Sequence, residues 1–220
     1  MRIENIRKSY GSRVILKDVS ICAESGKCIG IIGSNGSGKS TLLSILAGTL
    51  KKDSGSFVYN GIDIFNNPKK AAELVGYVPQ NTPLIEELTA KDNLKLWYSS
   101  QELKKQLSGG VLDMLGISEF IKMPVRKMSG GMKKRLAIGC AVARNPKILL
   151  LDEPSAALDI VCKERISEYL LSFKKNGGII LLATHDEREL PICDEIYILK
   201  NGLLSSYEYD GDLKKLAGSL

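Results

Sequence analysis

One stretch of the sequence fits the pattern G-x-x-x-x-G-K-[ST], which builds a loop around phosphate groups. It reads Gly33-Ser34-Asn35-Gly36-Ser37-Gly38-Lys39-Ser40-Thr41. The glycines let successive backbone N–H groups turn inward around an anion, where a Cβ atom would obstruct them. Lys39 is placed to reach the β- and γ-phosphates of a nucleotide, and the Ser40 hydroxyl is placed to ligate Mg²⁺. The stretch therefore predicts a nucleotide site.

The residues around this loop predict the fold class. The apolar run Cys28–Ile32 reads as a buried strand that enters the loop, and Ser40–Ala47 reads as a helix whose N-terminus faces the phosphates. Further apolar runs at Leu74–Val78, Ile148–Leu151 and Gly178–Thr184 predict more buried strands. We therefore expect an α/β fold with a parallel sheet at its nucleotide-binding core.

A second, antiparallel sheet is expected beside this core. The strand patterns Arg2–Ile6 and Val14–Ile21 are followed later in the chain by a hairpin signal, Asn60-Gly61, with Ile62–Phe65 as its second strand. The sequence thus predicts an antiparallel β subdomain from about 1–24 and 55–65.

A helical insertion is expected over about 86–140, within a single domain that spans 1–220. The triplet Ser-Gly-Gly occurs in it twice, at Ser108-Gly109-Gly110 and at Ser129-Gly130-Gly131. Only the second opens a long helical pattern, from Met132 to Arg144. A serine and two glycines at a helix start offer a hydroxyl, free N–H groups and the positive end of the helix dipole. We interpret Ser129, Gly130 and Gly131 as a second anion site, and the first triplet as a linker turn.

Polar side chains follow the predicted strands. Asp152, at a strand end, suits Mg²⁺ binding, and Glu153 suits the general base that polarises a water molecule. His185, the only histidine, follows another strand and is either structural or a contact to a γ-phosphate. Gln80 is either an ordinary loop residue or a partner of a metal-bound water. Tyr10 is either a strand-end tyrosine or a ring for an adenine base.

Composition indicates the broad class of protein and the compartment in which it works. The 220 residues are 44% hydrophobic and 25% charged, as in ordinary globular proteins. No apolar run reaches the ~18 residues of a membrane span, and the N-terminus lacks a signal-peptide pattern, so we expect a cytoplasmic protein. The net charge of +6 is spread as lysine pairs such as Lys133-Lys134, which usually mark solvated faces. Five cysteines without C-x-x-C spacing read as small buried hydrophobes: Cys22, Cys28, Cys140, Cys162 and Cys193.

Taken together, these motifs resemble the ATP-binding cassette (ABC) family, specifically the nucleotide-binding subunit of a bacterial transporter. The resemblance covers residues 2–206, with the motifs in family order: Tyr10, Gly33–Thr41, Gln80, Ser129-Gly130-Gly131, Asp152-Glu153, Ser155–Asp159 and His185. It implies a P-loop NTPase core with an antiparallel β subdomain and a helical subdomain. It also implies that Tyr10 stacks on adenine.

The resemblance further implies ATP and Mg²⁺ as ligands and ATP hydrolysis as the activity. Two subunits, as a homodimer or heterodimer, would clasp each ATP between one chain's phosphate loop and the other chain's Ser129. Lys39 would bind the phosphates, Glu153 would activate water and His185 would hold the γ-phosphate. Gln80 would contact the metal site and report nucleotide state to a separate transmembrane subunit. The protein would lie on the inner face of the cell membrane, and no nucleic acid partner is expected.

One position departs from the commonest family pattern. The signature usually reads Leu-Ser-Gly-Gly-Gln, and here it reads Met128-Ser129-Gly130-Gly131-Met132. The Ser hydroxyl and Gly amides make the phosphate contacts, so Met132 should not abolish activity. The run Ser-Gly-Gly-Met-Lys resembles ABC-2-type exporters more than importers.

Two other readings are possible. A soluble ABC ATPase, such as an accessory factor of iron–sulfur assembly, would share the cassette but have no membrane partner. Membrane pull-down distinguishes it from a transporter subunit. A non-catalytic basic binding module would need no intact set of Lys39, Asp152, Glu153 and His185, and the presence of all four argues against it.

Overall fold

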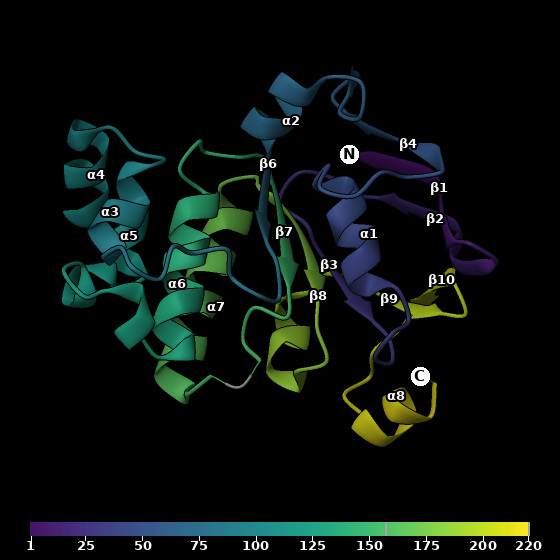
Figure 1. Ribbon diagram of the computed structural model, residues 1–220. Helices are drawn as coiled ribbons and strands as arrows, with labels where there is room; N and C mark the ends of the chain where they lie inside the picture. The colour runs from purple at the N-terminus through teal and green to yellow at the C-terminus, as the bar shows by residue number, and fades with distance from the viewer. Residues whose placement is uncertain (157, 220) are drawn as a thin grey trace.

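The computed structural model describes residues 1–156 and 158–219, and its centre is a six-stranded sheet (Figure 1). The strand order is β10-β9-β3-β8-β7-β6, with β10 antiparallel to β9 and the other neighbours parallel. The strands are β3 (Cys28–Ile32), β6 (Val75–Val78), β7 (Ile148–Asp152), β8 (Ile179–Ala183), β9 (Glu195–Lys200) and β10 (Leu203–Tyr207). This arrangement confirms the predicted parallel core.

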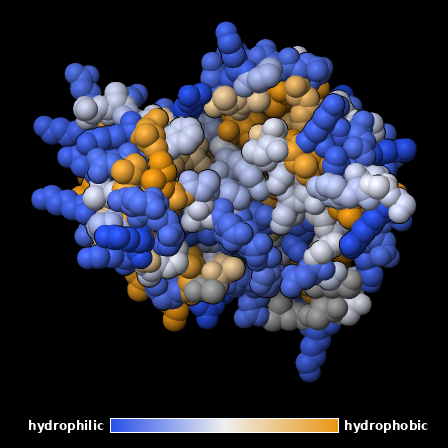
Figure 2. Space-filling model, viewed as in Figure 1, coloured by the Kyte–Doolittle hydropathy of each residue, from blue (hydrophilic) through white to orange (hydrophobic). Residues whose placement is uncertain are grey.

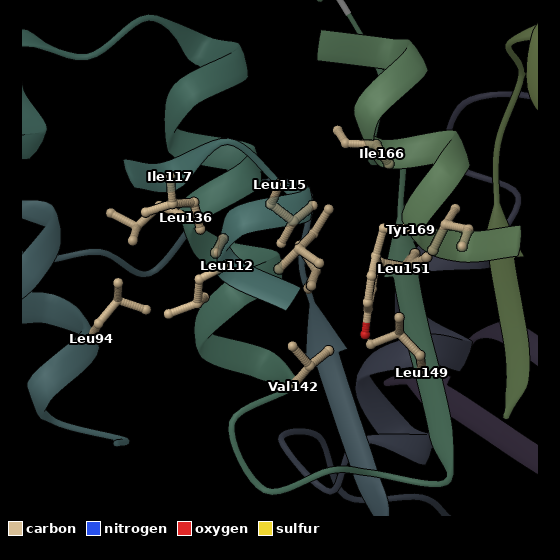
Figure 3. Close-up of a cluster of buried hydrophobic side chains, with 14 of the residues drawn as sticks. Leu94, Leu112, Leu115, Ile117, Leu136, Val142, Leu149, Leu151, Ile166 and Tyr169 are labelled. Atoms are coloured by element: carbon tan, nitrogen blue, oxygen red, sulfur yellow. The ribbon is translucent and has the colours of Figure 1, made fainter. Parts of the chain in front are cut away.

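The central strands are covered on both faces, which is why their sequences are continuous apolar runs. Every residue of β3, β7 and β8 is buried. Side chains alternate along β7: Ile148 and Leu150 belong to a core with α1 (Lys39–Leu46), whereas Leu149 and Leu151 belong to a core on the opposite face. Figure 3 shows the second core, in which Leu149 and Leu151 lie opposite side chains of the helices.

A second, four-stranded antiparallel sheet packs over α1, as predicted. Its order is β2-β1-β4-β5, formed by β1 (Arg2–Tyr10), β2 (Arg13–Cys22), β4 (Ser54–Tyr59) and β5 (Ile62–Asp63). The hairpin turn at Asn60 and Gly61 has φ values of 48° and 77°, which suit a two-residue hairpin.

The strand after this hairpin is shorter than predicted and ends at Asp63, not at Phe65. The Asp63 carboxylate accepts hydrogen bonds from the backbone N–H of Asn66 at 3.1 Å and from its side-chain amide at 2.6 Å. This local bonding turns the chain out of the sheet. It leads into α2 (Pro68–Leu74), a helix that the sequence analysis did not predict.

Short helices fill the segment between β6 and β7, which confirms the helical insertion (Figure 1). They are α3 (Ala90–Lys95), α4 (Ser100–Leu107), α5 (Val111–Met114), the 3₁₀ turns η1 (Ile117–Phe120) and η2 (Val125–Lys127), and α6 (Gly130–Ala141). Their apolar side chains share one core with α7 (Ile160–Lys175). The Ser108 triplet lies in the turn between α4 and α5, as expected of a linker.

Helix α6 begins and ends earlier than the predicted Met132–Arg144. The Ser129 hydroxyl accepts the N–H of Met132 at 3.2 Å and caps the helix, so Gly130 is its first residue. The helix ends at Ala141, and Asn145 then takes a left-handed φ of 50° before Pro146.

The chain ends with the 3₁₀ segment η3 (Glu187–Ile192), the β9–β10 hairpin and α8 (Leu213–Ser219). Among the described residues, no helix combines the length and the apolar character needed to cross a bilayer. The expectation that all five cysteines are buried holds for Cys28 and Cys162, whereas Cys140 and Cys193 are half-buried. It is wrong for Cys22, which is exposed because it ends β2 at the sheet margin.

Candidate functional site: a phosphate loop beside strand-end carboxylates

The phosphate loop connects β3 directly to α1, as the sequence predicts. Gly38 precedes α1 with a φ of 111°, which L side chains rarely adopt, and an added Cβ would lie 3.0 Å from Ile15. At Gly33, an added Cβ would lie 2.5 Å from the carbonyl oxygen of Leu199. Both positions therefore require glycine. The free N–H groups at the start of α1 and its positive dipole end face the loop's interior.

Lys39 bends back over this loop. Its Nζ donates hydrogen bonds to the carbonyl oxygens of Gly33 at 2.7 Å and Ser34 at 3.3 Å, and only 6% of the residue is exposed. Burial lowers the pKa of Lys39, and the carboxylates of Glu153 and Asp152 partly oppose that shift. The ammonium thus lies between the loop and two acidic side chains.

Asp152 ends β7 and lies beside the start of α1. Burial raises the pKa of Asp152, while a hydrogen bond from the Ser40 hydroxyl opposes that shift. Its Oδ1 is buried, and no partner for it occurs in the described part of the chain. A buried carboxylate oxygen without a partner is unfavourable unless a cation or a donor completes its bonding.

The neighbouring oxygens of Asp152 and Ser40 fit a hard cation such as Mg²⁺. This ion binds through one or two protein oxygens together with waters and phosphate oxygens. In residues 1–156 and 158–219, no cluster of three or more His, Cys, Asp or Glu side chains forms a complete protein cage. The residues present therefore fit a magnesium ion whose remaining ligands come from a nucleotide and water.

Glu153 follows Asp152 and holds two polar partners. Its Oε2 accepts a hydrogen bond from the Gln80 side-chain amide at 2.9 Å, and its Oε1 lies 3.1 Å from Nδ1 of His185. The Glu153 side chain is 10% exposed, whereas that of His185 is 56% exposed. The backbone of Glu153 has a left-handed φ of 49°, and its N–H donates to Ala183 of β8 at 2.8 Å.

A cavity of about 660 Å³ joins these groups except Asp152, which does not line it. It is lined by Tyr10, Arg13, Ile15, Asn35, Gly36, Ser37, Gly38, Lys39, Ser40, Thr41, Gln80, Glu153 and His185. The structure thus brings together residues from β1, the phosphate loop and three strand ends. Arg13 and Ile15 lie on β2 and were not among the predicted site residues, because a residue in an antiparallel strand carries no local signal of a ligand.

Tyr10 ends β1 at one wall of this cavity, with 52% of its surface exposed. Lys8 Nζ lies 5.2 Å from the centre of the tyrosine ring. An exposed ring at the wall of this cavity is available to a flat base, and stacking on adenine stays a prediction.

The Ser129 end of α6 does not line the cavity that contains Lys39. Ser129 and Gly130 are exposed, whereas Gly131 is buried against Cys162. The two anion sites predicted from the sequence are therefore separate within one chain, and one of them opens to solvent.

Three buried charged residues were not predicted from the sequence: Lys134, Arg135 and Glu189. The pair Lys133-Lys134 was expected on a solvated face, but Lys134 is only 6% exposed. It lies in a continuously buried stretch of α6, residues 134–139, so no alternation of polar and apolar positions in the sequence marks Lys134 as buried.

Comparisons with known proteins agree with this geometry. The protein family described as ABC transporter matches residues 16–156. The chain is 34% identical to the linearmycin resistance ATP-binding protein LnrL of Bacillus subtilis, over 92% of this chain and 67% of LnrL. It is 34% identical to the lantibiotic transport ATP-binding protein SrtF of Streptococcus pyogenes, over 96% of this chain and 92% of SrtF.

A solved structure is also similar. It is the dimeric ATP-binding cassette MJ0796 in a post-hydrolysis state bound to ADP and Pi, which superposes with a TM-score of 0.80 at 28% identity. The superposition covers 95% of this chain and all of that one.

Proposed function

This chain belongs to the ABC transporter family, and we propose that, as its ATP-hydrolysing subunit, it clasps each ATP between the phosphate loop of one copy and the Ser129 end of α6 from another. The observation that carries this proposal is the separation of the two anion sites. Ser129 and Gly130 are exposed and lie outside the cavity that holds Lys39. A second chain supplies the missing phosphate donors, and the dimeric state of MJ0796 supports that arrangement.

The residues of the cavity have separate roles in hydrolysis. The loop N–H groups and Lys39 bind the β- and γ-phosphates, for which Lys39 gives up its bonds to the Gly33 and Ser34 carbonyls. Ser40, Asp152 and Gln80 would hold Mg²⁺, which would supply positive charge against the phosphates. Tyr10 stacks on the adenine ring.

Glu153 accepts a proton from the attacking water. Its carboxylate is nearly buried and is oriented by Gln80 on one oxygen and His185 on the other. A general base must be held within hydrogen-bond reach of the water it activates. His185 is more exposed than Glu153 and is the side chain that also reaches the γ-phosphate.

The closed arrangement depends on the nucleotide. ATP favours two closed copies only because its γ-phosphate contacts both Lys39 of one chain and Ser129 of the other. Hydrolysis removes those shared contacts, and the two copies separate. The free energy of ATP hydrolysis thereby drives the separation of the two copies of this chain.

A separate transmembrane subunit receives this movement, so the protein lies on the inner face of the cell membrane. The docking surface is the loop after Gln80, residues 84–89, together with the end of α3. Ile85, Leu96 and Trp97 there are 45%, 60% and 54% exposed. Figure 2 shows one group of apolar residues on the helical side of the molecule, and others on the side of the antiparallel sheet. Apolar surface of this kind marks a contact site.

Export is the proposed direction of transport. The run Ser129-Gly130-Gly131-Met132-Lys133 resembles exporters, and the two relatives serve linearmycin resistance and lantibiotic transport. The observations leave homodimer and heterodimer equally open, because the single chain carries a complete set of proposed catalytic residues.

The test uses Glu153→Gln with ATP and Mg²⁺. The variant should bind ATP, stop turnover and form a stable dimer in light scattering, and it should bring a multi-span membrane protein from detergent-solubilised membranes of the native host. Turnover equal to the parent chain would contradict the role of Glu153. A dimer that brings only soluble proteins would favour the accessory-factor function, and unchanged assembly after charge reversal at Glu86 and Glu87 would contradict the docking surface.

A further inference from the structure

Lys134 is a buried ammonium group in the middle of α6. It lies five residues after Ser129, only 6% exposed, and its Nζ donates to the carbonyl oxygens of Pro79 and Gln80, both at 3.1 Å. Burial lowers the pKa of Lys134, and the carboxylates of Asp152, Glu153 and Glu189 oppose that shift. Lysine is almost never this buried unless it is paired. The carbonyl oxygens of Pro79 and Gln80 are the partners that the structure gives the buried ammonium.

The two carbonyls belong to the segment that leaves the sheet. Strand β6 ends at Val78, so Pro79 and Gln80 lie beyond its ladder of hydrogen bonds. Pro79 also has no N–H to donate. Pro79 is half-buried and Gln80 is exposed, whereas the Lys134 ammonium that donates to both of their carbonyl oxygens is buried. The position of Gln80 is therefore fixed to α6 by a side chain.

Gln80 continues the connection to the carboxylate. Its amide donates to Glu153 Oε2 at 2.9 Å. A continuous path thus runs from α6 through Lys134 to the backbone of Gln80, and from its side chain to Glu153. Ser129, at the exposed end of the same helix, is about one and a half helical turns from Lys134.

The neighbouring lysine provides the contrast. Lys133 Nζ lies 2.8 Å from Oε1 of Glu86, whose side chain is 61% exposed. An exposed pair of this kind contributes little to stability. Lys133 carries the same charge on the same helix but has no bond to Gln80 among those the structure describes.

We propose that Lys134 is a positioning residue for ATP hydrolysis, which fixes Gln80, and through it Glu153, to the helix that begins at Ser129. The inference rests on the proposed function, because it requires Glu153 to activate water. It adds that the carboxylate responds to the placement of α6: a shift of this helix moves the two carbonyl bonds, and the Gln80 amide moves with them. Lys134 thereby couples the contact that Ser129 makes at one end of α6 to the position of Glu153 in the same chain.

The test compares the full-length variants Lys134→Met and Lys133→Met. The first removes both donors at similar side-chain length, and kcat should fall about tenfold or more, since small errors in the placement of reacting groups cost up to about 100-fold. KM for ATP should stay within about twofold of the parent, because Lys39 and the loop are intact. Lys133→Met should keep kcat within about twofold of the parent.

A double-mutant cycle separates positioning from simple stability. In a Gln80→Ala chain, adding Lys134→Met should change kcat by less than about twofold, because the path to Glu153 is already broken. The inference would be overturned if the kcat losses of the two single variants multiplied in the double variant. It would also be overturned if the Lys134→Met chain were as active as the parent. If the methionine variant does not fold, Lys134→Gln replaces it in the cycle, because its uncharged amide is one atom shorter than the lysine side chain and weakens both carbonyl bonds. The kcat of Glu153→Gln, measured in the same series, separates failure of this inference from failure of the proposed function. An active Glu153→Gln chain would mean that the proposed function itself is wrong.

Discussion

The side-chain amide of Gln80 lies 2.9 Å from Oε2 of Glu153, so a residue beyond β6 orients a carboxylate at the end of β7. The two residues are 73 positions apart in the chain, with the entire helical insertion between them. The parallel pairing of β6 and β7 brings their carboxyl ends to one edge of the sheet. The helical insertion therefore lies in the chain between two residues that meet at this edge of the sheet.

His185→Ala should reduce kcat by roughly 100-fold, because Glu153 Oε1 loses its partner and the γ-phosphate loses a contact. The melting temperature should change little, since the His185 side chain is 56% exposed. Phosphate release at saturating ATP, with a thermal melt of the same preparation, measures both. A variant with parental kcat would remove His185 from the mechanism.

Lys39→Met should abolish the stabilisation of the protein by ATP while leaving the nucleotide-free protein close to its parental melting temperature. The ammonium of Lys39 is buried, and burial lowers its pKa, so loss of its two carbonyl bonds is offset by the removal of a buried charge. Thermal melts with and without ATP and Mg²⁺ test this. Retained stabilisation by ATP would contradict the phosphate role of Lys39.

Asp152→Asn should raise the melting temperature of the nucleotide-free protein at pH 7 by a few degrees. Burial raises the pKa of Asp152 in the folded state. The parent chain is therefore more stable when Asp152 is protonated, and it loses that stability as the pH rises from the ordinary aspartate pKa through the raised one. The advantage of asparagine should therefore vanish as the pH falls below about 4, the ordinary aspartate value.

The same variant should weaken the dependence of ATP binding on Mg²⁺, because the unpartnered Oδ1 is lost as a carboxylate oxygen. Calorimetric titration with ATP, at several Mg²⁺ concentrations, measures this effect. An unchanged magnesium dependence would exclude Asp152 as a ligand.

Ser129→Asp should block ATP-driven dimerisation without unfolding α6. Aspartate caps a helix as well as serine does, but it places a negative charge where the partner's γ-phosphate would bind. The matched neutral variant, Ser129→Asn, keeps the cap without that charge. Light scattering with Glu153→Gln in the background should give a monomer for aspartate and a dimer for asparagine, and equal dimer formation would contradict the clasp.

Tyr10→Ala should raise KM for ATP by about tenfold, given the ~1–3 kcal/mol that a base gains by stacking on an aromatic ring. Tyr10→Phe keeps the ring and should stay within about twofold of the parent. Steady-state kinetics with ATP distinguishes the two. Equal KM values for all three chains would restore the interpretation of Tyr10 as an ordinary strand-end residue.

The sheet core and the phosphate loop could be predicted because local sequence determines them. Ile148–Leu151 is an apolar run long enough for one buried strand, and a carboxylate that follows it must lie at the sheet edge. The loop needs glycine where φ is positive, as at Gly38, so its pattern is written in consecutive residues. The Asn60-Gly61 turn was predictable for the same reason.

Features that depend on distant chain segments could not be predicted. Lys134 looks like half of a surface lysine pair, and its burial depends on carbonyl groups of Pro79 and Gln80 that lie more than fifty positions away. Strand β5 ended early because Asp63 bonds to Asn66, a contact that competes with the sheet ladder and that apolar patterning does not register.

The exposure of Ser129 and Gly130 has a consequence for how fast the protein works. If hydrolysis requires the α6 end of another copy, the rate per chain depends on how often two chains meet, and it falls on dilution. A membrane subunit that holds two copies side by side replaces that encounter with a local effective concentration, which reaches the millimolar range for closely tethered sites. The transmembrane partner would then act as an activator of the ATPase simply by holding its two copies together.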